Sequence, residues 1–249
     1  MQNVIDQAIG YIKNSKYAVA FTGAGISVES GIPSFRGKGG VWEKYGEDMF
    51  EIDYFNSHKV KCWRLLSMGF YAKTLAASPN PSHNVLAKME EQGVIKSVIT
   101  QNIDGLHVKA GSKKVYHLHG QASVLICQTC GNAYEVFKFD LQDGPPRCET
   151  CGDILKPNFV FFGENLPEYD IRHATVETVK CDLMLVIGST GIVYPAASFP
   201  AQAKTNGAKI VEINPHRSKF TNTITDMFIQ MPASQAFKLI ARGLGLQEG

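Results

Sequence analysis

The stretch CDLMLVIGST, residues 181–190, decides the fold of this chain. Its apolar residues follow one another without alternation, which is typical of a strand buried on both faces of a parallel sheet. The similar stretch AKIVEINP follows at residues 208–215, and we expect a helix between the two at about 195–205. Strand, helix and strand in this order form a β-α-β unit, so the pattern predicts an α/β fold with a doubly wound parallel sheet.

The rest of the chain keeps alternating between strands and helices. Further strands are expected at 17–21, 94–100 and 114–118. Further helices are expected at 3–13, 60–78, 81–93 and 233–244. Two segments interrupt this order. Residues 29–56 are too long for an ordinary connection, and residues 122–157 have the pattern of an inserted module, after which PNFVFFGE (157–164) is expected to resume the main domain.

The composition is that of a folded, soluble protein. Hydrophobic residues make up 44% of the 249 residues and charged residues 19%, which is enough apolar material for a core. The net charge is +2 and no dense run of Lys and Arg occurs, so nucleic acid is not expected as a direct ligand. No signal peptide and no run of about eighteen apolar residues is present, which predicts a cytoplasmic protein that does not enter a membrane.

Four of the six cysteines form two close pairs, Cys127 with Cys130 and Cys148 with Cys151, separated by 17 residues. Two C-x2-C pairs in a chain expected in the cytoplasm indicate a zinc site rather than disulfides. Four thiolates fill the tetrahedral shell of zinc and leave no position for water, so the zinc is expected to be structural.

The sequence FTGAGIS at 21–27 places a glycine-rich turn after the first expected strand. Gly23 and Gly25 match the first two glycines of the dinucleotide-binding pattern G-x-G-x-x-G. Val28 occupies the third place, and no acidic residue follows at the end of a second strand. This turn alone fits a nucleotide site and a merely tight connection equally well.

Polar or glycine-rich sequence follows five of the expected strands. The five stretches are TGAG (22–25), TQNID (100–104), HLHG (117–120), VIGST (186–190) and EINP (212–215). Ligands of doubly wound sheets bind at the carboxyl ends of the strands. Five such exits therefore favour a ligand with phosphates, riboses and an amide.

His119 is the histidine best placed for chemistry, because it precedes a glycine at a strand exit, where its side chain can meet a ligand. An imidazole with a pKa of about 6.5 is a suitable general base. His83 is expected near a helix start and His107 beside the QNID loop, whereas His117 receives no role. The remaining histidines are expected at the surface or at helix ends: His58, His173 and His216.

Eight stretches in collinear order resemble the sirtuins, the NAD-dependent protein lysine deacylases, most closely the single-domain members of bacteria and archaea. They are GAGISVESGIPSFRG, TQNIDGLH, HLHG, the two C-x2-C pairs, PNFVFFGE, GST, VYPA and EINP. The resemblance implies a Rossmann-like large domain at about 1–31, 79–121 and 158–249. It implies a small domain made of a cofactor loop with a helical insertion, about 32–78, and a four-cysteine zinc ribbon, about 122–157.

The resemblance also implies roles for individual residues. The NAD site would comprise Gly23, Ala24, Gly25, Phe35, Arg36, Gln101, Asn102, Ile103, Asp104, His119, Gly188, Ser189 and Asn214. An acetyl-lysine peptide would be held in extended form by Val160, Phe161, Phe162, Gly163, Ile192, Val193 and Tyr194. His119 matches the catalytic base of the family, with Asn102 and Asp104 beside it.

The implied reaction transfers the acyl group to NAD. The acyl oxygen of the modified lysine attacks C1′ of the nicotinamide ribose and expels nicotinamide. His119 then helps to deprotonate a ribose hydroxyl, which attacks the imidate carbon. Water completes the release of free lysine and O-acetyl-ADP-ribose, and the zinc takes no part.

The choice of acyl group follows from a further comparison with the family. Sirtuins that prefer succinyl or malonyl groups carry Tyr-x-x-Arg on the helix before the PN…H segment. Here the two places fall at about Ser67 and Phe70, and the nearby Tyr71 is followed by Thr74. No cation is then available to pair with an acyl carboxylate, which predicts a preference for neutral acyl groups, acetyl first.

Three other functions are alternatives. A protein mono-ADP-ribosyltransferase would use the same NAD site, although the intact QNID and HLHG stretches favour deacylation. An NAD-dependent dehydrogenase is disfavoured by the incomplete glycine pattern and the missing ribose acid. A zinc ribbon that contacts nucleic acid is disfavoured by its charges, which are Lys138, Arg147 and Lys156 against Glu135, Asp140, Asp143, Glu149 and Asp153.

Overall fold

The fold is centred on a parallel sheet. The computed structural model describes residues 2–33, 40, 46 and 48–246. Six strands run parallel in the order β3-β2-β1-β7-β8-β9, which confirms the doubly wound arrangement expected from the sequence. Their bounds are β1 Ala18–Thr22, β2 Ile95–Thr100, β3 Val115–His117, β7 Leu183–Ile187, β8 Lys209–Ile213 and β9 Met227–Ile229.

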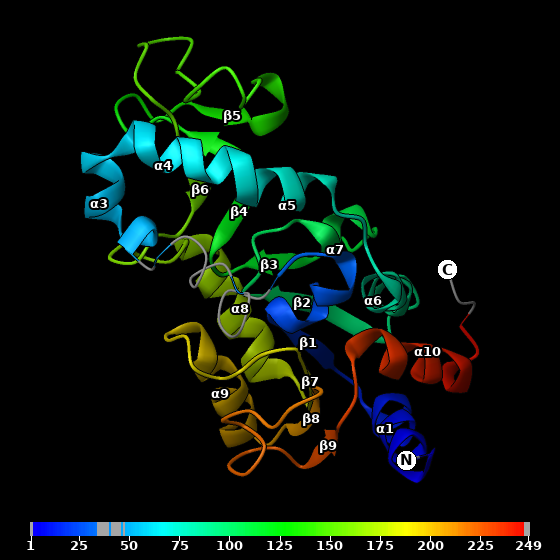
Figure 1. Cartoon of the computed structure of the whole chain (residues 1–249). Coiled ribbons are helices and arrows are strands. Elements are labelled where there is room, and N and C mark those ends of the chain that lie inside the picture. The colour runs from blue at the N-terminus through cyan, green and yellow to red at the C-terminus, as the bar shows by residue number, and fades with distance from the viewer. Residues whose placement is uncertain (1, 34–39, 41–45, 47, 247–249) are drawn as a thin grey trace.

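Helices cover both faces of the sheet (Figure 1). The helices of one face are α1 (Gln2–Asn14), α6 (Pro81–Glu91) and α10 (Ala233–Leu244), and those of the other are α8 (Glu168–Lys180) and α9 (Phe199–Thr205). Val98 and Leu185 of the sheet belong to the first hydrophobic layer, and Phe21 and Val186 belong to the second. The strands are therefore buried on both sides, which is why their sequences do not alternate. The sequence did not indicate α8, β9 or the short α7 (Leu106–Lys109).

A second, antiparallel sheet lies above the first in Figure 1. Its strands, in the order β5-β4-β6, are β5 Ala133–Glu135, β4 Gly120–Ile126 and β6 Lys156–Phe159. The helical run beside it comprises α3 (Ile52–Ser57), α4 (Lys59–Leu65), a π-helical turn (Leu66–Tyr71) and α5 (Ala72–Ala76). Trp63 joins the helical run to the sheet, because its indole N–H donates to the Leu155 carbonyl at 2.7 Å and the side chain lies in the core between them.

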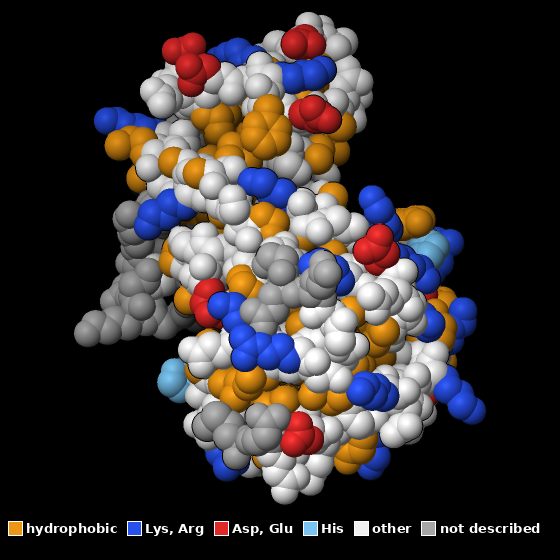
Figure 2. All heavy atoms as spheres, turned by 90° about the vertical axis from the view of Figure 1, so that its right-hand side faces the viewer, with side chains coloured by type: hydrophobic (Ala, Val, Ile, Leu, Met, Phe, Trp, Pro, Cys, Tyr) orange, Lys and Arg blue, Asp and Glu red, His pale blue; other side chains and the backbone are white. Residues whose placement is uncertain are grey.

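The second sheet and its helices form a narrow part of the molecule, next to the broader domain of the parallel sheet (Figure 2). Lysine and arginine side chains are scattered over the face that Figure 2 shows. None of the helices in the described part of the chain is long and apolar enough to cross a membrane.

Some expectations about the narrow part need correction. The stretch PNFVFFGE was expected to resume the main domain, and its first residues belong to β6, which pairs with β4 in the small sheet. Gly120 makes this pairing possible, because a Cβ at this position would lie 2.2 Å from the Asn158 carbonyl oxygen. The irregular stretch expected at 29–56 contains most of α3, and the helix expected at 60–78 is interrupted by the π-helical turn.

The loops that leave β1 and β7 interlock through glycine. The Gly25 N–H donates to the Gly188 carbonyl at 2.9 Å, and the Gly188 N–H donates to the Ile213 carbonyl at the end of β8 at 3.0 Å. The φ of Gly188 is +60°, and a Cβ there would lie 2.4 Å from the Ile26 nitrogen. Only glycine fits this position, so the exits of three strands are held together at one place.

Gly188→Ala is expected to destabilise the fold much more than an ordinary Gly→Ala change, because the methyl group would collide with backbone atoms of the β1 exit. We expect a loss of at least about 3 kcal/mol in the free energy of unfolding, measured in urea. Gly245→Ala is the matched control: φ is +74° but no described atom lies within 4 Å, so a loss of about 1–2 kcal/mol is expected. Equal losses for the two variants would contradict the steric interlock.

Candidate functional site

One cavity gathers all five polar strand exits. It lies beside the carboxyl ends of the parallel strands and has a volume of about 420 Å³. The segment that follows β6 closes its other side. The predicted site residues that line it are Gly23, Ala24, Gly25, Gln101, Asn102, Ile103, His119, Gly188, Ser189, Asn214, Val160, Phe161, Phe162, Gly163, Val193 and Tyr194.

The other predicted site residues lie elsewhere. Asp104 lines a smaller cavity, which shares Ala24, Asn102 and Ile103 with the larger one. Ile192 is 42% exposed and does not line either cavity. The predicted residues Phe35 and Arg36 lie outside the described residues.

His119 has a defined tautomer. It lies in the turn between β3 and β4, half-buried, and its Nδ1 is 2.9 Å from the Gln101 carbonyl oxygen. A carbonyl can only accept a hydrogen bond, so Nδ1 carries the proton and Nε2 is left as the acceptor. Burial lowers the pKa of His119, which the bond to Gln101 partly offsets. At neutral pH the side chain is therefore an uncharged base at the cavity wall.

A buried network fixes Asn102 and Asp104. The Asn102 side-chain amide donates to the Gly23 carbonyl at 3.1 Å and to Ser27 Oγ at 3.2 Å. Ser27 in turn donates to the Asp104 carboxylate at 2.7 Å. Burial raises the pKa of Asp104, whereas the bonds from the Leu106 N–H and Ser27 lower it.

His83 supports the same network from α6. Its Nδ1 accepts the Asn80 N–H at 3.3 Å, which completes the helix cap, and its Nε2 lies 3.5 Å from Ser27 Oγ. Burial lowers the pKa of His83 to about 4, so the ring is neutral and Nε2 is the donor. His83 thus lies in the first turn of α6, near the helix start as expected, and its ring also contacts Ser27.

His107 holds the QNID loop from the sheet side, in agreement with the sequence-based expectation. Its Nε2 lies 2.9 Å from Thr22 Oγ1, and Thr22 donates to Thr100 Oγ1 at 2.8 Å. Thr100 Oγ1 also accepts the backbone N–H of Asn102 at 3.0 Å. Hydrogen bonds through two threonines at neighbouring strand ends therefore fix the backbone of Asn102 relative to the sheet.

The segment after β6 leaves backbone groups unpaired at the cavity. The Val160 N–H donates to the His119 carbonyl at 2.9 Å, and the Phe162 N–H donates to the Phe50 carbonyl at 2.8 Å. Neither the Val160 carbonyl nor the Gly163 N–H forms a hydrogen bond within the residues that the structure describes. The Phe161 side chain is buried in the core, so it can meet a ligand only through its backbone.

The four paired cysteines lie together, as the sequence predicts. Their sulfur atoms are all within 4.8 Å of one another, with 3.4 Å between Cys127 and Cys151 and 3.5 Å between Cys130 and Cys148. None of the four is in a disulfide. Thiolates at about 2.3 Å from a tetrahedral zinc are about 3.8 Å apart, so the cluster fits one structural zinc ion.

The sequence did not single out Ser27, Lys156 or Glu164. Ser27 stands in the quoted GAGIS stretch, but its partner Asp104 is 77 residues away, so no local signal reveals the bond. Glu164 closes the quoted stretch PNFVFFGE and lines the cavity. His117 is buried beside the site, and its backbone N–H donates to Asp170 on α8 at 2.8 Å.

Comparison with known proteins points to one family. Residues 23–195 match the Sir2 family. An NAD-dependent protein deacetylase of Thermotoga maritima is 43% identical over 217 residues, which cover 86% of this chain and 88% of that protein. An NAD-dependent protein deacylase of Aeropyrum pernix is 39% identical over 236 residues, which cover 94% of this chain and 95% of that protein.

Solved structures agree with this result. A Sir2 structure with a deacetylated p53 peptide and 3′-O-acetyl ADP-ribose has a TM-score of 0.89 and 38% identity, over 98% of this chain and 99% of that one. A complex of a Sir2 homologue with NAD has a TM-score of 0.89 and 38% identity, over 96% of this chain and 94% of that one. Sequence and fold thus confirm the resemblance, and the chain belongs to the Sir2 family.

Proposed function

We propose that this protein removes acetyl groups from protein lysine side chains with NAD as cosubstrate, giving nicotinamide, O-acetyl-ADP-ribose and free lysine. One observation carries the proposal: the interlocked glycine loops, His119, and the Val160 carbonyl and Gly163 N–H all lie at one cavity, and within the described residues His119 Nε2 and those two backbone groups have no hydrogen-bond partner. The relatives named as NAD-dependent deacetylase and deacylase support it, as does the Sir2 complex with deacetylated peptide and acetyl ADP-ribose.

NAD would lie along the strand exits. The backbone N–H groups of Ala24 and Ser189 form no hydrogen bond within the described part of the chain, and such groups suit phosphate oxygens. Asn214 would hold the adenosine ribose, and its amide donates to the Ser189 carbonyl at 3.0 Å. Residues 101–104 would surround the nicotinamide ribose. The places of Phe35 and Arg36 in the cofactor loop stay predictions.

The chain's own groups then move one proton and orient the reacting atoms. When bound, NAD supplies a ribose that loses nicotinamide and takes up the acyl group. His119 Nε2 would accept the proton of a ribose hydroxyl. Asn102 Oδ1, which accepts no hydrogen bond from the described residues, would orient that hydroxyl or a water. Asp104 would close the nicotinamide end of the site.

The substrate peptide would add a strand between two segments. The Val160 carbonyl and Gly163 N–H would pair with it on one side, and residues 192–194 would lie on the other. These pairing groups favour deacylation over the alternative, transfer of ADP-ribose to a protein, because that reaction needs no extended acyl-lysine segment.

We also propose that Cys127, Cys130, Cys148 and Cys151 bind zinc that shapes the small domain without taking part in the reaction. All four ligand positions of a tetrahedral ion would be filled by sulfur. The domain boundaries and the cytoplasmic location stay predictions.

His119→Ala is expected to lower deacetylation by about 10²–10⁴-fold, because the base is lost, while NAD binding and zinc content stay nearly unchanged. The assay incubates the protein with NAD and an acetyl-lysine peptide and follows nicotinamide release and peptide mass. The unaltered enzyme should release nicotinamide only with peptide present, and the peptide should lose one acetyl group. NADH formation, peptide-independent nicotinamide release, or a peptide that gains ADP-ribose would contradict the deacetylase function.

Cys148→Ser is expected to release zinc and lower the free energy of unfolding by roughly 3 kcal/mol or more, because the free energy of zinc binding contributes directly to folding. Zinc content by mass spectrometry and thermal unfolding measure the two effects. Cys181→Ser is the control, since this buried cysteine lies outside the cluster. The metal assignment fails if Cys148→Ser retains zinc, or if Cys181→Ser loses it.

Acetyl peptides should be preferred over succinyl peptides by about 100-fold or more in kcat/KM, since a buried carboxylate without a partner is costly. The charged side chains among the described residues that line the two cavities are acidic, Glu164 and Asp104, and Phe70 lines the smaller cavity. Phe70→Arg should lower the ratio of kcat/KM for acetyl over succinyl peptides, because the arginine supplies a partner for the succinyl carboxylate. The same change at Phe137, which is 70% exposed, should leave this ratio unchanged. A comparable narrowing in both variants would refute this explanation.

A further inference from the structure

We propose that Lys156 and Glu164 are positioning residues, which hold segment 159–163 in the shape that pairs with the substrate peptide. The inference rests on the proposed function, because it concerns how that enzyme binds its peptide. The two residues flank the segment: Lys156 starts β6, three residues before Phe159, and Glu164 directly follows Gly163.

Lys156 is buried and fully satisfied, with 4% of its surface exposed. Its Nζ donates to the carbonyls of Pro157 and Phe159, each at 2.9 Å, and lies 2.9 Å from Glu164 Oε2. The ammonium is also 4.6 Å from the centre of the Phe161 ring. Each of its three protons therefore has an acceptor, which compensates the burial of the charge.

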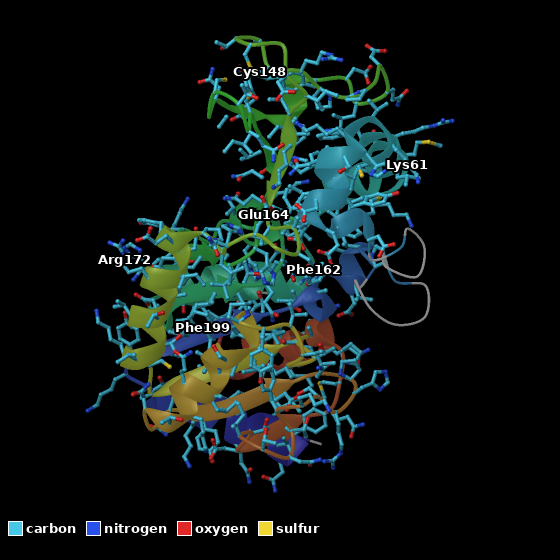
Figure 3. The ribbon with its side chains drawn as sticks, turned by 90° about the vertical axis from the view of Figure 1, so that its left-hand side faces the viewer. Lys61, Cys148, Phe162, Glu164, Arg172 and Phe199 are labelled. Carbon is cyan, nitrogen blue, oxygen red and sulfur yellow. The ribbon has the colours of Figure 1, made fainter. Side chains whose placement is uncertain are left out.

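Glu164 ties the far end of the segment to the same point. Its Oε2 accepts the Phe161 N–H at 2.8 Å, and its own N–H donates to the Phe161 carbonyl at 3.1 Å. The carboxylate thus closes a turn over residues 161–164 and pairs with the Lys156 ammonium. Figure 3 shows Glu164 and Phe162 at the junction between the narrow part, which carries Cys148, and the large domain, which carries Phe199.

The ion pair engages the backbone groups that the peptide does not need. It binds the Phe159 carbonyl and the Phe161 N–H, while the His119 and Phe50 carbonyls accept the N–H groups of Val160 and Phe162. The Val160 carbonyl and the Gly163 N–H are left for the peptide. A segment ordered in advance does not have to lose conformational freedom when the peptide binds.

A purely stabilising role explains this ion pair poorly. Replacing a buried ion pair by apolar side chains of similar size is often neutral or stabilising. All three N–H groups of the Lys156 ammonium bind acceptors in or next to this one segment, namely two backbone carbonyls and the Glu164 carboxylate. We therefore expect the ion pair to fix the conformation of segment 159–163, so that its loss weakens the binding of the peptide.

Lys156→Met and Glu164→Gln test the inference. Deacetylation is measured with a long acetyl-lysine peptide and with a single acetyl-lysine blocked at both ends, which cannot pair along the segment. Lys156→Met should raise KM for the long peptide about tenfold, and Glu164→Gln about threefold. The KM values for NAD and for the blocked acetyl-lysine, and kcat, should change less than about twofold.

Lys114→Met is the matched control. Lys114 pairs with the buried Glu177 at 2.7 Å but does not line the cavity, so its loss should leave both KM values unchanged. An equal rise in KM for the long and the blocked substrate, or a rise for NAD, would overturn the positioning role. If Lys156→Met does not fold, Glu164→Gln carries the test, because it keeps the shape of the side chain.

Peptide binding, measured by fluorescence anisotropy, distinguishes failure of the proposed function from failure of the positioning role. If the unaltered protein binds no acetyl-lysine peptide, the proposed function fails and this inference fails with it. If the unaltered protein binds and both variants bind equally well, this inference alone is overturned. Weaker binding of the long peptide by the variants, with unaltered NAD binding, is the expected result.

Discussion

The contact between Gly25 and Gly188 holds the exits of β1 and β7 together at the wall of the large cavity. The loops leaving β1 and β7 meet backbone to backbone, with one hydrogen bond of 2.9 Å and no room for a Cβ on either residue. At this place the wall of the cavity is therefore made of main chain, and the N–H groups of Ala24 and Ser189 have no hydrogen-bond partner among the described residues. A site with such a wall suits a ligand rich in phosphate oxygens.

The junction between His119 and Gly120 separates the chemistry from the metal. The Leu118 N–H donates to the Thr100 carbonyl at 3.0 Å, which keeps His119 at the edge of the large sheet. Gly120 then begins β4, a strand of seven residues that ends just before Cys127. At about 3.3 Å per residue the strand spans roughly 20 Å. His119 and Cys127 are close in sequence but lie at opposite ends of this strand. His119 is the proposed base, and Cys127 belongs to the four-cysteine cluster.

Much of the fold could be predicted from the sequence, because local patterns encode it. The unbroken apolar run at 183–187 indicated β7, the polar strand exits indicated the cavity, and the spacing of the four cysteines indicated their cluster. Short elements without a strong pattern were missed, such as β9, and so was the pairing of β6 with β4, which depends on the close approach allowed by Gly120.

The side-chain networks of the site could not be predicted in this way. Ser27 meets His83 and Asp104 only because the β1 exit, α6 and the QNID loop converge in space. In the sequence, Lys156 is one charged residue among several in the inserted module. Only the structure shows that β6 brings its ammonium into contact with the Phe159 carbonyl and Glu164. Bonds between elements far apart in the chain leave no periodicity or spacing that a single sequence would show.

The most direct test of the central claim is a crystal structure of the protein with NAD and an acetyl-lysine peptide. We expect both ligands in the one cavity, with the peptide paired to the Val160 carbonyl and Gly163 N–H and the nicotinamide ribose beside His119 Nε2. A peptide bound outside this cavity, or NAD bound away from the Gly25–Gly188 contact, would contradict it.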